Sequence, residues 1–119
     1  MQNLNQIQSE APILKKTTDL YKEFYECLKT FPKKDQHMLG KKCEENIIDF
    51  MELILSAVSS YKQEKKAKLL EANNKFDLLK VLLRMAREFK MIDNKKYLNL
   101  EEKIQEIGRM LGGWIKSLN

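Results

Sequence analysis

The chain has 119 residues, 33% of them charged, and its 22 basic and 17 acidic side chains give a net charge of +5. This length allows one domain with a single core and excludes a multidomain protein. The sequence has no run of about 18 apolar residues that would span a membrane. It also lacks the charged start and apolar block of a secretory signal. We therefore expect a cytoplasmic protein.

The composition is typical of long helices, because leucine, lysine, glutamate, isoleucine and methionine dominate and only four glycines and two prolines occur. Residues 1–12 are polar and rich in glutamine and asparagine, and we expect them to form a flexible lead-in to a domain over residues 13–119. Apolar residues at spacings of three and four predict a first helix over residues 13–30. It should end there because the residue before Pro32 is disfavoured in a helix.

Two further helices follow in the predicted order. Pro32 suits the first turn of a second helix, which continues to about Ser59 at helical spacing. A third helix is predicted over residues 62–91, with two apolar stripes that span roughly 160° of its surface. The stripes are Leu69, Ala72, Phe76, Leu79, Leu83 and Ala86, and beside them Leu78, Leu82, Met85 and Phe89. So broad an arc predicts burial from two directions, inside the bundle and against another subunit.

The last predicted helix follows a cap at Asp93 or Asn94. Four amphipathic helices with short connections predict an all-α fold, an antiparallel up-down four-helix bundle. Each glycine inside this helix costs about 1 kcal/mol of helix propensity, so we expect these glycines to admit a neighbouring helix. The residues assigned to packing or oligomer contacts are Gly40, Gly108, Gly112, Gly113 and Trp114. Gly108→Leu or Gly112→Leu should then disrupt packing or assembly.

The excess of positive charge lies on the third predicted helix, where residues 62–91 hold nine basic and four acidic groups. Five basic residues share a face about 60° wide, and they are Lys62, Lys66, Lys80, Arg84 and Arg87. A smaller cluster comprises Lys33, Lys34, Lys41 and Lys42. Such runs are either solvated helix faces or ridges that follow nucleic-acid phosphates. No aromatic residues alternate with them, so the pattern indicates backbone contacts without base stacking.

The sequence contains no constellation of catalytic residues. His37 is the only histidine, and the glycine motifs that bind nucleotide phosphates are absent. Cys27 and Cys43 lack the spacing of a metal site. We interpret them as small buried residues, with a disulfide between neighbouring helices as the alternative. We therefore expect a binding protein that is not an enzyme and has no metal or cofactor.

Two segments carry a family resemblance. Residues 31–42 read FPKKDQHMLGKK, and residues 107–114 read IGRMLGGW. Together with the lysine-rich helix between them, they resemble Avd, the accessory protein of diversity-generating retroelements, over residues 14–117. The pattern is also similar to a broader family of four-helix bundles that includes proteins encoded by intervening sequences in bacterial ribosomal RNA genes.

The resemblance implies a basic homopentamer that binds nucleic acid, RNA or DNA, and the reverse transcriptase of the element. Such a protein supports the synthesis of mutagenised cDNA without being catalytic. We expect the phosphate or partner contacts to come first from the five-residue basic face of the third helix. A second group comprises Lys33, Lys34, Lys41, Lys42, Arg109 and Lys116. The alternative is a structural homo-oligomer of the intervening-sequence type, without a reverse transcriptase partner.

Overall fold

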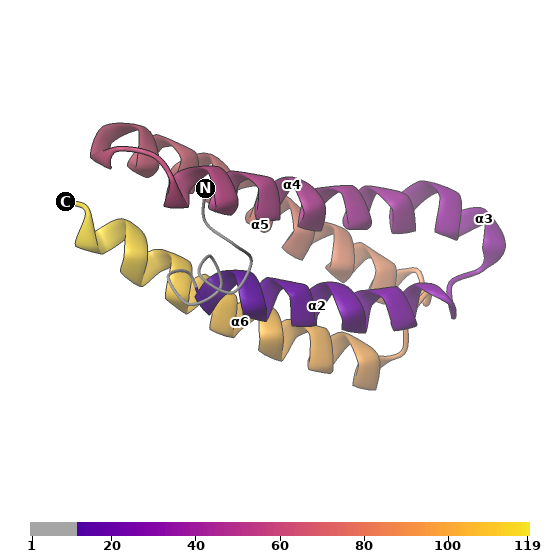
Figure 1. Ribbon diagram of the computed structural model, residues 1–119. Helices are drawn as coiled ribbons and strands as arrows, with labels where there is room; N and C mark the ends of the chain where they lie inside the picture. The colour runs from indigo at the N-terminus through magenta and orange to yellow at the C-terminus, as the bar shows by residue number, and fades with distance from the viewer. Residues whose placement is uncertain (1–11) are drawn as a thin grey trace.

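Four long helices form an antiparallel bundle in the computed structural model, which describes residues 12–119 (Figure 1). In chain order the elements are α2 (Pro12–Leu28), the short α3 (Lys33–Asp35), a π-helical turn η1 (Gln36–Gly40), α4 (Lys41–Val58), α5 (Lys62–Glu88) and α6 (Asn94–Ser117). No strand occurs within the described residues. The predicted all-α fold is thereby confirmed. Of the predicted lead-in only Pro12 is described, as the first residue of α2, and the rest lies outside the described residues.

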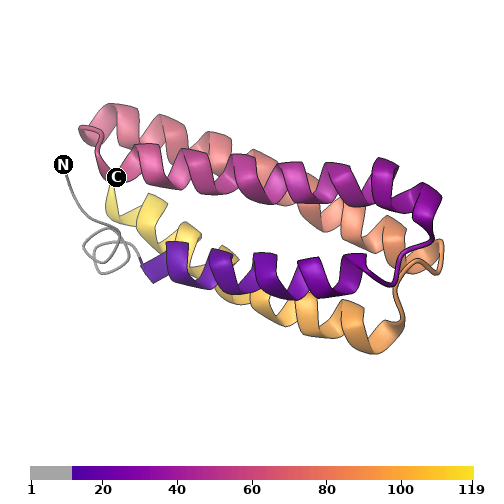
Figure 2. The same cartoon turned by 45° about the vertical axis from the view of Figure 1, so that its right-hand side comes forward.

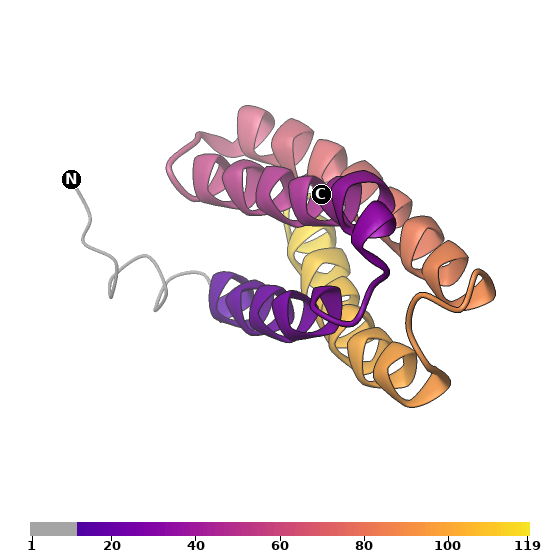
Figure 3. The same cartoon turned by 90° about the vertical axis from the view of Figure 1, so that its right-hand side faces the viewer.

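The helices pack in two layers, with α4 and α5 in one layer and α2 and α6 in the other (Figures 1 and 3). Successive long helices run in opposite directions, and across the layers α5 packs on α6 and α2 packs on α4 (Figure 2). The core between the layers includes Phe24, Phe50 and Phe76, which are almost completely buried. The ring centroids of Phe50 and Phe76 are 4.7 Å apart. Burial of such large apolar side chains is the main favourable contribution to folding.

The second predicted helix is found over residues 33–58, with Pro32 at its N-cap, and it contains a π-helical turn, η1, that was not predicted. Gly40 ends this turn and is buried against α2. A Cβ at Gly40 would overlap the Leu28 side chain and lie 3.2 Å from the Asp35 carbonyl oxygen. The Gln36 side chain donates a hydrogen bond to the Phe31 carbonyl at 3.1 Å, which ties the turn to the end of the preceding connection.

The two apolar stripes of α5 differ in burial. The first stripe is buried along its whole length, whereas in the second Leu82 is buried and Leu78 and Phe89 are 40% and 64% exposed. Within the single chain, α4 and α6 pack against α5, and the predicted contact of the second stripe with another subunit stays a prediction. The large exposed apolar residues of α5 and its C-cap are Leu70, Leu78, Val81 and Phe89, named here the apolar α5 face.

The turn between α5 and α6 has a left-handed residue. Lys90 has φ 63°, the conformation that glycine usually supplies after a helix. The amide of Lys90 donates to the Arg87 carbonyl at 3.0 Å, and the amide of Met91 donates to the Ala86 carbonyl at 2.8 Å. This pair of hydrogen bonds ends α5 at Glu88, three residues before the predicted end. Asp93 then caps α6 by accepting a hydrogen bond from the Lys96 amide at 2.8 Å.

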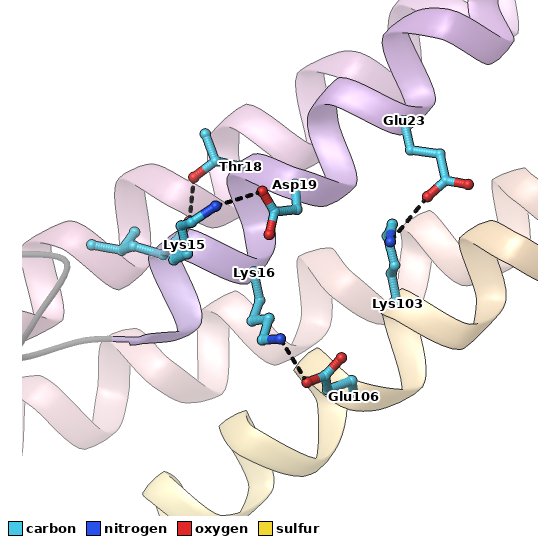
Figure 4. Close-up of polar contacts among 8 residues, drawn as sticks. Lys15, Lys16, Thr18, Asp19, Glu23, Lys103 and Glu106 are labelled. Carbon is cyan, nitrogen blue, oxygen red and sulfur yellow. Dashed lines mark hydrogen bonds and ion pairs between the residues drawn. The ribbon is translucent and has the colours of Figure 1, made fainter.

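Polar contacts join neighbouring helices at the surface of the bundle, within the layer of α2 and α6 and between the two layers. Lys16 of α2 lies 3.0 Å from Glu106 of α6, and Lys103 of α6 lies 3.3 Å from Glu23 of α2 (Figure 4). These pairs are exposed, so each adds at most about 1 kcal/mol to the free energy of unfolding. Between α2 and α4, the Tyr21 hydroxyl donates to Glu44 at 2.9 Å, and this hydrogen bond raises the pKa of Tyr21. Within residues 12–119, no helix has the length and apolar character needed to cross a membrane.

Candidate nucleic-acid interface

A pocket of about 450 Å³ lies between α5 and α6. Three cationic side chains line this pocket, Lys80 and Arg84 from α5 and Arg109 from α6. All three are exposed, and neither arginine belongs to an ion pair within residues 12–119. Positive charge from two facing helices thus converges on one groove, which is an arrangement that attracts phosphate.

The rest of the pocket is of mixed character. Its apolar lining consists of the buried residues Leu83, Tyr97 and Ile104, and its other polar lining consists of Asn73, Glu101 and Gln105. Glu101 carries the one negative charge among these lining residues, so it partly offsets the three cations. The groove therefore offers cations, amides and an apolar surface at one place.

The basic side chains of α5 differ in the contacts that restrain them. Lys80 lies 3.3 Å from the Asp77 carboxylate, and its ammonium is 5.5 Å from the centroid of the Phe76 ring. Arg87 is half-buried, with its guanidinium carbon 4.1 Å from the centroid of the Tyr97 ring. Arg87 therefore supports an aromatic residue of the pocket from outside the pocket lining, and Arg84 is the less constrained arginine of this helix.

The other predicted basic residues lie away from the pocket. Lys66, near the start of α5, donates a hydrogen bond to the Asn119 side chain at 2.6 Å, and Lys62 is exposed beside it in the chain. Lys116 is exposed in the last turn of α6. The remaining four are Lys33, Lys34, Lys41 and Lys42, which are exposed on α3 and at the start of α4. The structure thus brings together Lys80, Arg84 and Arg109 from the predicted set.

The glycines of α6 differ from the expectation of close helix packing. Gly108 lines the pocket, and a Cβ there would lie 4.0 Å from the Phe76 ring, an ordinary contact. Gly112 and Gly113 are exposed, and a Cβ at either would meet no atom within 4 Å among the described residues. Close approach of a helix to these three glycines is therefore not found within residues 12–119. Trp114 is half-buried and packs against the core.

Glu101 and Gln105 are lining residues that the sequence reasoning missed. On α6 they share one face with Gly108 and Arg109, because residues spaced by three, four, seven and eight lie close together around a helix. The spacing was therefore visible in the sequence. The prediction for this helix used only its apolar stripe, its glycines and Arg109.

The two cysteines lie in the hydrophobic core, Cys27 near the end of α2 and Cys43 near the start of α4. Cys27 and Cys43 are both buried and both free, so the alternative of a disulfide between them is not realised in this structure. Burial raises the pKa of Cys27 and raises that of Cys43 to about 12. No group of three or more potential metal ligands occurs among residues 12–119.

Comparison with known proteins places the chain in a family. The model of the bAvd-like family matches residues 12–118, which include all four long helices and every residue of the pocket. No curated protein gives a significant match. The match agrees with the resemblance carried by the segments FPKKDQHMLGKK and IGRMLGGW. The chain therefore belongs to the bAvd-like family and is an Avd-like accessory protein.

Proposed function

We propose that this protein is a non-catalytic accessory factor of a diversity-generating retroelement. It binds the template RNA or the cDNA through the groove between α5 and α6, and it binds the reverse transcriptase of the element. In this way it supports mutagenic retrohoming. Membership of the bAvd-like family supports the proposal. The single observation that carries it is the convergence of Lys80, Arg84 and Arg109 on one groove.

The physical basis of nucleic-acid binding is the release of counterions. Each lysine or arginine that neutralises a phosphate frees a condensed cation, so that affinity falls as the salt concentration rises. Arg84 and Arg109 have no carboxylate partner within residues 12–119 and so give up no ion pair there when they bind a phosphate. Both arginines of the groove are therefore available to a polyanion.

Homo-oligomer formation belongs to the same proposal, with five subunits as the expected number. The apolar α5 face supports it, because Val81 and Phe89 are 49% and 64% exposed on a chain whose core is otherwise well covered. Adjacent exposed apolar side chains mark interaction surfaces. Several copies of a moderately basic groove would bind one long nucleic acid more tightly than a single copy does, through the effective concentration of the linked sites.

The test of nucleic-acid binding compares two triple variants by fluorescence anisotropy with a labelled RNA. We expect Lys80→Gln, Arg84→Gln and Arg109→Gln together to lower the affinity and to reduce the slope of log affinity against log salt by about 2. The control triple is Lys22→Gln, Lys29→Gln and Lys95→Gln, which removes the same charge from residues that lie outside both the groove and the predicted contact set. Equal losses in the two triples would show that only total charge matters, and the assignment to the groove would be wrong.

The reverse transcriptase is tested separately. A co-purification of the chain with the polymerase of its own retroelement should succeed, and it should do so with nuclease present if the contact is direct. Comparing the two triple variants in that assay shows whether the groove also contacts the polymerase.

The second candidate function is a purely structural homo-oligomer, which the apolar α5 face alone also favours. RNA binding at low salt distinguishes the two functions. A structural oligomer would give no measurable RNA binding at low salt, where electrostatic binding is strongest.

A further inference from the structure

The pocket between α5 and α6 contains more than phosphate binding requires. A site for phosphate alone needs donors and positive charge. This pocket also presents the buried side chains of Leu83 and Ile104 and the carboxylate of Glu101, which repels an anion. Its volume of about 450 Å³ lies within the usual range of small-ligand pockets. These features require a ligand that has an apolar, hydrogen-bonding part as well as an anionic part.

The amides of the pocket provide the hydrogen-bonding groups for such a ligand. Asn73 of α5 and Gln105 of α6 both line the groove, and neither side chain makes a hydrogen bond to another residue within 12–119. Each amide offers a donor and an acceptor together, which is the pairing that the edge of a nucleobase presents. The carboxylate of Glu101 accepts hydrogen bonds from the exocyclic amino or ring N–H groups of a base.

We propose that this pocket takes up one nucleotide, with its base against Leu83 and Ile104 and its phosphate on Arg84 and Arg109. The source of that nucleotide rests on the proposed nucleic-acid function. It is a nucleotide of a single strand whose base is turned outward. A base inside a duplex is stacked and paired and does not reach such a pocket. A free nucleotide has the same chemistry, so the experiment distinguishes the two sources.

Gly108 contributes the space that the nucleotide needs. It lines the pocket without a side chain, and a Cβ at this position would make only an ordinary contact with Phe76. A Cβ at position 108 is therefore compatible with the fold, and the longer side chain of a leucine would extend into the groove. Gly113 lies on the same helix but outside the pocket, where a Cβ meets no atom within 4 Å. These two glycines form a matched pair for testing the pocket.

The experiment measures binding of a single-stranded RNA of about ten nucleotides and of a duplex of equal length, together with AMP and inorganic phosphate. The variants are Gly108→Leu and the double variant Asn73→Ala, Gln105→Ala. Their controls are Gly113→Leu and Asn74→Ala, since Asn74 is the exposed neighbour of Asn73 outside the pocket. None of these substitutions changes the net charge. Circular dichroism and thermal unfolding first establish that each variant is folded.

We expect both pocket variants to weaken single-strand binding by about tenfold, the loss expected for a hydrogen-bonded base contact. Duplex binding, the salt dependence and both controls should remain as in the unaltered chain. If AMP binds in competition with the single strand, the strand supplies the nucleotide. If AMP binds and the strand does not compete, the pocket serves a free nucleotide, and the site is still supported.

Three outcomes would overturn the inference. Single-strand affinity that is unchanged in both pocket variants, together with no binding of AMP, would show that no base enters the pocket. Equal losses for Gly108→Leu and Gly113→Leu would assign the effect to α6 as a whole. Inorganic phosphate that competes as well as AMP would reduce the pocket to an anion site. Failure of the proposed function looks different, because the unaltered chain would then bind neither the strand nor the duplex at low salt.

Discussion

Gly40 and Gly113 both have helical backbone but opposite surroundings. Gly40 is enclosed by Leu28, Phe31 and the Asp35 carbonyl of α3, whereas Gly113 is exposed with no neighbouring atom within 4 Å of a built Cβ. Sequence reasoning treated the glycines alike, because helix propensity shows only that a glycine is unfavourable in a helix. It does not show which neighbour lies opposite. The distances to surrounding atoms decide the role, and these depend on the tertiary structure.

Alanine substitution should therefore have opposite effects at these two glycines. Gly113→Ala should raise the free energy of unfolding by up to about 1 kcal/mol through helix propensity. Gly40→Ala should lower it by about 1 kcal/mol, since the new Cβ would lie 3.2 Å from the Asp35 carbonyl oxygen and displace Leu28, which together exceed the propensity gain. Urea denaturation of both variants measures the two effects. A stabilised Gly40→Ala would show that Leu28 moves aside freely and that the enclosure of Gly40 is unimportant.

Cys43 should be much less reactive than a free cysteine. Its burial raises the pKa from 9.0 to about 12. Only the thiolate is alkylated, so at about pH 8 the reactive fraction falls by roughly 1,000-fold. We expect iodoacetamide to label Cys27 first in the native protein and to label Cys43 only as the chain unfolds. In denaturant both should react at similar rates. Fast labelling of native Cys43, seen by mass spectrometry of its peptide, would contradict its burial.

At the scale of the elements, the helices were predictable and their interruptions were less so. The spacing of apolar residues, together with Pro32 for the end of α2, predicted the bounds of α2, α5 and α6 to within three residues at each end. The π-helical turn was missed because it depends on how Gly40 meets Leu28 and Phe31, residues of the preceding segments. The sequence predicted one of the two walls of the groove. The basic face of α5 was identified, and its opposite wall on α6 was recognised only in Arg109.

The turn that ends α5 gives a prediction at this scale. Lys90 adopts a left-handed conformation that costs a residue with a side chain roughly 1–2 kcal/mol. Lys90→Gly should remove this cost and, after the greater chain entropy of glycine is subtracted, raise the free energy of unfolding by about 0.5–1 kcal/mol. Glu71→Gly, at an exposed position inside α5, is the control and should lower it by about 1 kcal/mol. Thermal or urea unfolding of both variants provides the comparison.

At the scale of the whole molecule, the bundle follows from the sequence because each helix has a continuous apolar side. Phe24, Phe50 and Phe76 lie on the predicted stripes and meet in the core. What covers the second stripe of α5 does not follow from the same pattern. An apolar period shows that a surface avoids water. It does not show whether another helix of the chain or another chain covers that surface.

The apolar α5 face should mediate self-association. We expect the native mass in solution to be a multiple of the 14.1 kDa chain, five times that value in the proposed assembly. Val81→Glu with Phe89→Glu should shift the mass towards the monomer, because association would bury these carboxylates. Tyr25→Glu on α2, an exposed aromatic outside this face, is the control. Multi-angle light scattering measures the masses, and an unchanged oligomer in the double variant would place the interface elsewhere.

A single helix, α5, carries three surfaces along its 27 residues: one side in the core, one wall of the pocket, and the apolar α5 face. A rigid helix cannot move one of these surfaces without moving the others. Any displacement of α5 on self-association would therefore alter the width of the groove, and a ligand in the groove would alter the strength of association. Such coupling is reciprocal and equal in free energy. Nucleic acid would then act as an effector of assembly, and the subunit number would depend on what the groove holds.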